Sequence, residues 1–114
     1  MVRIHANGVD DSGVSGALAM VPSAYNPYVG NMYTECFNLG SCILNAYCEE
    51  TGLKNDGIME TDDMTGINWC QMPVMILEMG FMTNPGDDTY MADGNHHQTM
   101  VTGIANGIDQ YFGR

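Results

Sequence analysis

Apolar residues recur along this chain with two different spacings. They fall at the three- and four-residue steps of an amphipathic helix from about Tyr28 to Thr51, and again from Met100 to Phe112. Short and nearly continuous apolar runs elsewhere are typical of buried strands. The runs that predict strands are residues 1–6, 14–21, 57–61 and 73–78. Apolar strands alternating with helices predict an α/β fold with a mainly parallel open sheet flanked by helices.

Composition indicates one small globular domain spanning residues 1–114. Of the 114 residues, 45% are hydrophobic and 15% are charged, which is enough apolar material to bury a core. No apolar run approaches the roughly 20 residues that cross a bilayer, and no cationic-then-apolar leader is present. We therefore expect neither a membrane span nor a signal peptide within this chain.

The charge balance excludes partners that are recognised through their phosphates. Three basic residues stand against 14 acidic ones, for a formal net charge of −11. Binding to nucleic acid requires clustered Lys and Arg side chains, whereas Arg3, Lys54 and Arg114 are far apart in the sequence. We expect no binding to nucleic acid or to anionic membrane surfaces.

The four cysteines do not form a recognisable metal or redox motif. Cys36, Cys42, Cys48 and Cys70 lack CxxC spacing. Three of them are spaced six residues apart on one predicted helix, where six residues turn about 600°, so neighbours do not share a face. They are interpreted as buried or half-buried free thiols.

Two residues with metal and acid–base chemistry follow apolar runs. His5 and Glu78 each stand at the carboxyl end of a predicted strand, the edge at which open α/β sheets bind ligands. An imidazole is a good zinc ligand, and a carboxylate beside a zinc-bound water can act as a general base. A metal-dependent hydrolase is one interpretation. The alternative is structural, because both side chains could instead satisfy backbone groups of the following loops.

Other polar groups are weaker candidates. The adjacent His96 and His97 would point about 100° apart on a helix, and we interpret them as the exposed start of the last helix. Ser15 lacks the GxSxG spacing of a nucleophile elbow. Three acidic pairs without an EF-hand pattern are expected to be solvated turns: Asp10-Asp11, Asp62-Asp63 and Asp87-Asp88.

Two sequence blocks resemble the zinc-dependent N-acetylmuramoyl-L-alanine amidases, which are bacterial cell-wall hydrolases with an α/β fold. The blocks are Ile4-His5-Ala6-Asn7 and residues 73–84, PVMILEMGFMTN. The second is the more specific, with an apolar strand, a Glu, then Gly-Phe and Asn. The similarity extends over essentially the whole chain.

The resemblance implies a role for each candidate residue. His5 matches a zinc (Zn2+) ligand, and Glu78 matches the catalytic glutamate that handles the proton. The implied substrate is peptidoglycan, cut at the amide between N-acetylmuramic acid and L-alanine, and the implied location is secreted or associated with the cell wall.

One departure from the family pattern concerns the zinc site. The family completes that site with a His and a Glu upstream of the His-Ala-Asn motif, but only residues 1–4 precede His5. The sequence therefore resembles the C-terminal portion of an amidase domain, without its N-terminal strands and helices. One imidazole should hold zinc weakly, and the strand carrying His5 should expose an unpaired edge. We expect that edge to favour either a homo-oligomer or pairing with the missing N-terminal fragment.

Two other functions are compatible with the sequence. The first is a non-catalytic remnant that binds peptidoglycan or a protein through the old cleft. The second is a free-standing α/β domain that uses Glu78 for acid–base chemistry without a metal.

Overall fold

Four strands form one mixed sheet in the computed structural model, which describes all 114 residues. The order across the sheet is β1-β4-β2-β3, so β1 and β3 are the two edges. The pairs β1–β4 and β2–β3 are parallel, and the central pair β2–β4 is antiparallel. The strands are β1 (Val2–Asn7), β2 (Ala17–Val21), β3 (Asn55–Glu60) and β4 (Met75–Phe81). The predicted mainly parallel open sheet is confirmed, with one antiparallel pairing inside it.

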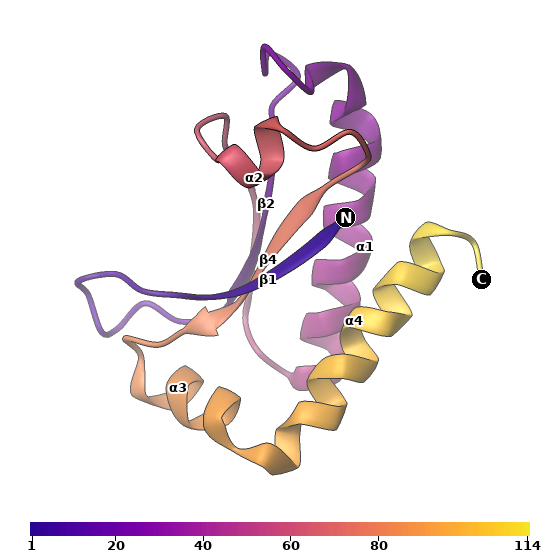
Figure 1. The fold of residues 1–114 in the computed structure, drawn as a ribbon. Helices are drawn as coiled ribbons and strands as arrows, with labels where there is room; N and C mark the ends of the chain where they lie inside the picture. The colour runs from indigo at the N-terminus through magenta and orange to yellow at the C-terminus, as the bar shows by residue number, and fades with distance from the viewer.

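Two long helices, α1 (Tyr33–Thr51) and α4 (His97–Tyr111), pack against each other on one side of the sheet (Figure 1). They approach closely because α4 carries glycine at the contact. A Cβ built on Gly107 would lie 2.4 Å from the Cα of Ile43 on α1. The sequence predicts this pair of helices, and the left-handed backbone of Gly52 ends α1.

Shorter elements complete the fold. The short helix α2 lies on the side of the sheet away from α1 and α4, and α3 follows β4 (Figure 1). The short elements are η1 (Gly30–Met32), α2 (Thr65–Asn68), α3 (Pro85–Ala92) and η2 (Gly94–His96). None of the helices is long and apolar enough to cross a membrane.

The core lies between the sheet and the α1–α4 pair. On β2 the residues facing α1 are fully buried, whereas Leu18 and Met20 on the other face are half-buried. The strand β4 is buried on both faces, with Met75, Ile76 and Leu77 all at 0% exposure. A strand buried on both faces is typical of the centre of an α/β sheet.

Several predicted boundaries are shifted. The strand expected over 14–21 begins only at Ala17, because Gly16 has a φ of +110° and breaks the extended run. The helix expected from Tyr28 begins at Tyr33, after a 3-10 turn. All four cysteines are free thiols, in agreement with the sequence analysis.

Candidate functional site

The two candidate residues lie side by side on neighbouring strands. His5 on β1 and Glu78 on β4 are direct register partners in the parallel pair, so their side chains emerge on the same face. His5 Nδ1 lies 3.6 Å from Glu78 Oε1. This separation is longer than a hydrogen bond and corresponds to an electrostatic contact. The structure therefore brings together two residues that are 73 positions apart in sequence.

Both residues lie further inside their strands than predicted. His5 is the fourth residue of a six-residue strand, and Glu78 is the fourth residue of a seven-residue strand. The prediction that β4 ends at Glu78 and that Met79 and Gly80 begin a loop is wrong. The strand continues to Phe81, which pairs with Asn7 after a register shift.

Burial sets the electrostatics of the pair. The Glu78 side chain is 7% exposed and the His5 side chain is 38% exposed. Burial raises the pKa of Glu78 above its usual value, and the nearby imidazole of His5 partly offsets that rise. Oε2 of Glu78 is the one buried side-chain polar atom without a hydrogen-bond partner in the protein. Leaving a buried oxygen unpaired costs stability, and such groups cluster at functional sites.

The buried carboxylate of Asp87 holds together the segment before β2 and the turn after β4. Asp87 Oδ2 accepts hydrogen bonds from Gly16 N at 2.8 Å and from Phe81 N at 3.0 Å. It thereby joins the start of β2, the end of β4 and the first turn of α3. Asn84 caps α3 by accepting from Asp87 N, and its amide donates to Ser12 O at 3.0 Å. The loop after β1 is thus fastened to the turn after β4.

The prediction that Asp87 lies in a solvated turn is wrong, because the residue is only 5% exposed. The segment Asn84-Pro85-Gly86-Asp87 contains the signal that would have identified it. Asn is a preferred N-cap, Pro is favoured at the first helical position, and an acid three residues after the cap is typical of a capping interaction.

A second acidic pair is also more than a solvated turn. Asp62 accepts hydrogen bonds from Ser23 N, from Ser23 Oγ and from Asn26 Nδ2. These bonds lower the pKa of Asp62 below its usual value. Its neighbour Asp63 and the pair Asp10-Asp11 are exposed, as predicted.

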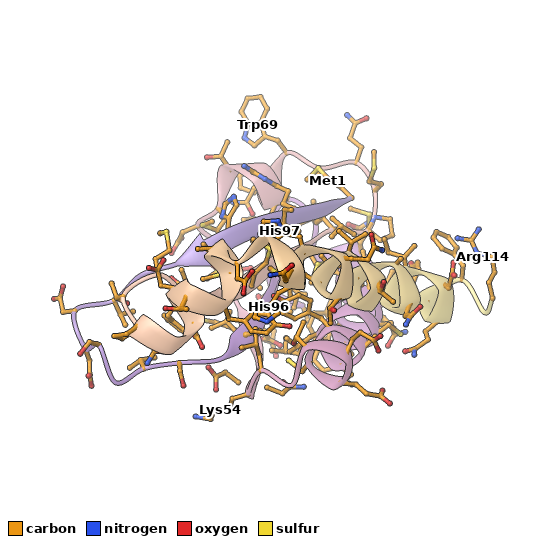
Figure 2. The ribbon with its side chains drawn as sticks, turned by 90° about the horizontal axis from the view of Figure 1, so that it is seen from below. Met1, Lys54, Trp69, His96, His97 and Arg114 are labelled. Atoms are coloured by element: carbon orange, nitrogen blue, oxygen red, sulfur yellow. The ribbon has the colours of Figure 1, made fainter.

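The remaining candidates lie apart from the His5–Glu78 pair. His96 is half-buried, stacks on Tyr90 with ring centroids 3.9 Å apart, and contacts the Tyr90 carbonyl through Nδ1. His97 is exposed and lies 2.8 Å from the carbonyl of Met91. Figure 2 shows both imidazoles at the junction of α3 and α4. The chain contains no group of three His, Cys, Asp or Glu side chains that could hold a metal ion.

His5 and Glu78 offer the kinds of atoms that bind zinc, but there are too few of them for a catalytic site. A neutral imidazole and a carboxylate oxygen are both zinc ligands, and Oε2 of Glu78 is unpartnered. A catalytic zinc normally takes three protein ligands and keeps its fourth position open. These two residues do not by themselves form such a site.

The comparisons with known proteins identify the family. The model of the N-acetylmuramoyl-L-alanine amidase family Amidase_3 matches residues 1–110. The chain belongs to this family. It is 30% identical over 111 residues to the uncharacterized protein YqiI of Bacillus subtilis. That match covers 97% of this chain and 50% of YqiI. It is 28% identical over 69 residues to the probable cell wall amidase LytH of Staphylococcus aureus, covering 60% of this chain and 24% of LytH.

Solved structures share the fold. The CwlD amidase of Clostridioides difficile, determined with the GerS lipoprotein, superposes with a TM-score of 0.85 at 21% identity, covering 98% of this chain and 53% of CwlD. The amidase AmiC2 of Nostoc punctiforme superposes with a TM-score of 0.83 at 25% identity, covering 99% of this chain and 57% of AmiC2. The chain spans about half the length of YqiI and of these solved amidases.

Proposed function

We propose that this chain is the part of a peptidoglycan hydrolase that carries the proton-transfer carboxylate and one metal-binding imidazole. The reaction is hydrolysis of the amide between N-acetylmuramic acid and L-alanine, the bond named by the family. The observation that supports it most directly is the buried Glu78, with a free oxygen and His5 at 3.6 Å, on adjacent parallel strands. The expected site of action is the cell wall, outside the cell.

Glu78 suits the proton transfers of amide hydrolysis. A carboxylate can take a proton from the attacking water while the water oxygen bonds to the amide carbon. It can then return that proton to the leaving nitrogen as the carbon–nitrogen bond breaks. A pKa raised by burial brings the carboxyl closer to neutral pH, where it exchanges a proton most effectively.

His5 is the proposed zinc ligand. Zinc, when bound, lowers the pKa of its water towards about 7 and polarises the carbonyl. Because Glu78 is assigned to proton transfer, His5 is one ligand of the usual three, and we expect this chain to bind zinc weakly without donors from elsewhere.

Zinc binding and hydrolysis provide separate tests. Titration calorimetry with Zn2+ should detect binding that His5→Ala removes, whereas the exposed His97→Ala should leave it unchanged. When donors from outside the chain complete the zinc site, peptidoglycan digestion should release stem peptides with a new L-alanine amino terminus, and Glu78→Gln should abolish that release. Zinc binding that is insensitive to His5→Ala, or hydrolysis that survives Glu78→Gln, would contradict the assignment.

A second candidate function is a non-catalytic module that binds peptidoglycan. The absence of any three-residue metal-ligand group in the chain favours it. Its signature would be sedimentation of the chain with insoluble peptidoglycan, without zinc binding at micromolar supply and without release of peptides.

A further inference from the structure

Two segments that are far apart in sequence meet at the end of the sheet opposite α3 (Figure 1). Because β2 runs antiparallel to β4, residues 22–29, which follow β2, come beside residues 61–72, which lie between β3 and β4. Where these segments begin, the backbone N–H of Thr61 donates to the carbonyl of Val21 at 2.9 Å. Neither segment contains a residue that we assign to hydrolysis.

The buried amide of Asn26 holds the two segments together. Asn26 is 6% exposed, and its Nδ2 donates to Asp62 Oδ1 at 2.9 Å and to Asn68 Oδ1 at 2.8 Å. Its Oδ1 accepts from the backbone N–H of Tyr28 at 2.9 Å and from that of Val29 at 3.0 Å. All the hydrogen-bonding positions of this amide are thus occupied. One side chain therefore fixes both the backbone at Tyr28 and the end of α2.

A hollow of about 570 Å³ lies between the two segments, which is within the roughly 300–1,000 Å³ of small-molecule sites. Tyr28 lines the hollow from one segment, and Trp69 lines it from the other. Both rings are open to solvent, with Tyr28 69% exposed and Trp69 82% exposed. The indole of Trp69 projects away from the ribbon (Figure 2). Tryptophan is highly buried on average, so this exposure is unusual.

The rest of the lining is uncharged. It consists of Pro27, Val29, Cys70 and the two amide side chains of Asn68 and Gln71. None of the 14 acidic residues lines the hollow, although the net charge of the protein is −11. The ligand that fits this lining is therefore neutral, with apolar surface for the two rings and polar groups for the amides.

A saccharide ring has both of these properties. Its C–H groups form apolar faces that pack against the electron-rich face of an aromatic ring, and the hydroxyl and acetamido groups around it form hydrogen bonds with amides. A protein partner fits less well, because seven residues line the hollow, whereas a stable protein interface takes about 20–30 residues a side. The contacts available thus match a short saccharide better than a folded partner.

We propose that the hollow between Tyr28 and Trp69 binds N-acetylhexosamine units of a peptidoglycan glycan strand, apart from the residues that act on the amide bond. The choice of saccharide rests on the proposed function, whereas the site for a neutral sugar rests on the geometry of the hollow. Because Asn26 fixes both walls before the ligand arrives, little ordering is lost on binding. A strand bound there stays on the protein whether or not a zinc site is complete.

Oligomers of N-acetylglucosamine provide the test, because they are neutral and carry neither the stem peptide nor the bond that is hydrolysed. The chain is titrated with the tetramer in EDTA, so zinc binding and hydrolysis cannot influence the result. Trp69 is the only tryptophan, so its fluorescence reports on the hollow directly. A sugar stacked on the indole should shift the emission to shorter wavelength. Titration calorimetry measures the affinity of variants that lack the indole.

Substitutions of the two rings locate the site. Trp69→Ala and Tyr28→Ala should each weaken binding by about tenfold, the effect of losing one stacked ring. Tyr28→Phe keeps the ring and should bind as the wild type does. Phe112→Ala is the matched control, because Phe112 is an aromatic residue that is 63% exposed at the end of α4.

The outcomes separate this site from the proposed hydrolysis. Failure of the oligomer to bind overturns the proposal, as does equal weakening by Phe112→Ala. Binding of a free stem peptide to the hollow in place of the sugar overturns it as well. Sugar binding that depends on Tyr28 and Trp69, in a protein that releases no peptide from peptidoglycan, would support the site and reject only the hydrolysis.

Discussion

Replacing Glu78 with Gln should make the folded protein more stable at neutral pH. The carboxylate is almost fully buried, and Oε2 has no partner. Leaving a buried polar atom unpaired costs about 1–3 kcal/mol, and more when the group is charged. The amide of Gln removes the charge but leaves one polar atom unpaired, so we expect a gain of about 1 kcal/mol in the free energy of unfolding. For a domain of this size the corresponding rise in Tm is about 4 °C.

The pH dependence of this effect has a definite sign. Burial raises the pKa of Glu78 in the folded state, so the folded protein holds that proton more tightly than the unfolded chain. The contribution of Glu78 to stability is therefore greatest below its unfolded pKa of about 4.3, and it falls as pH rises through the folded pKa. The wild type and Glu78→Gln should be nearly equal in stability at pH 4, and the difference between them should grow as pH rises from 4 to 8.

Urea denaturation at pH 4 and pH 7.5 measures the difference directly. Glu49→Gln removes an exposed carboxylate from α1 and should change the free energy of unfolding by less than about 0.5 kcal/mol at either pH. If Glu78→Gln is less stable than the wild type at pH 7.5, the charged carboxylate stabilises the fold through His5. The argument from burial would then be refuted.

Three further substitutions or measurements test the scaffold. Asp87→Ala should lower the free energy of unfolding by about 2–4 kcal/mol in urea, because two backbone N–H groups lose their acceptor. Gly107→Ala should lower the free energy of unfolding by about 1–3 kcal/mol or more, because the new methyl group would overlap the backbone of Ile43. Unchanged stability would mean that α1 and α4 separate freely. Burial raises the pKa of Cys48 to about 11 and also raises that of Cys36, so both thiols should react with Ellman's reagent only after urea is added. Rapid modification of either thiol in the native protein would contradict the burial.

The sequence predicts the elements whose signals are local. The period of apolar residues identifies α1 and α4, and a glycine after the last periodic residue marks the end of α1 at Gly52. The convergence of His5 and Glu78 is predicted only on the condition that their two strands are neighbours, and the order β1-β4 meets that condition. Two apolar strands that pair in parallel bring residues at equivalent positions together.

Features that depend on tertiary contacts are not visible in the pattern. Gly80 was expected in a loop, yet it lies within β4, where a Cβ would come within 3.2 Å of the Met91 side chain. The burial of Asp87 depends on backbone N–H groups from segments 71 and six residues away in sequence. The antiparallel pairing of β2 with β4 likewise depends on strand order, which the spacing of apolar residues does not specify.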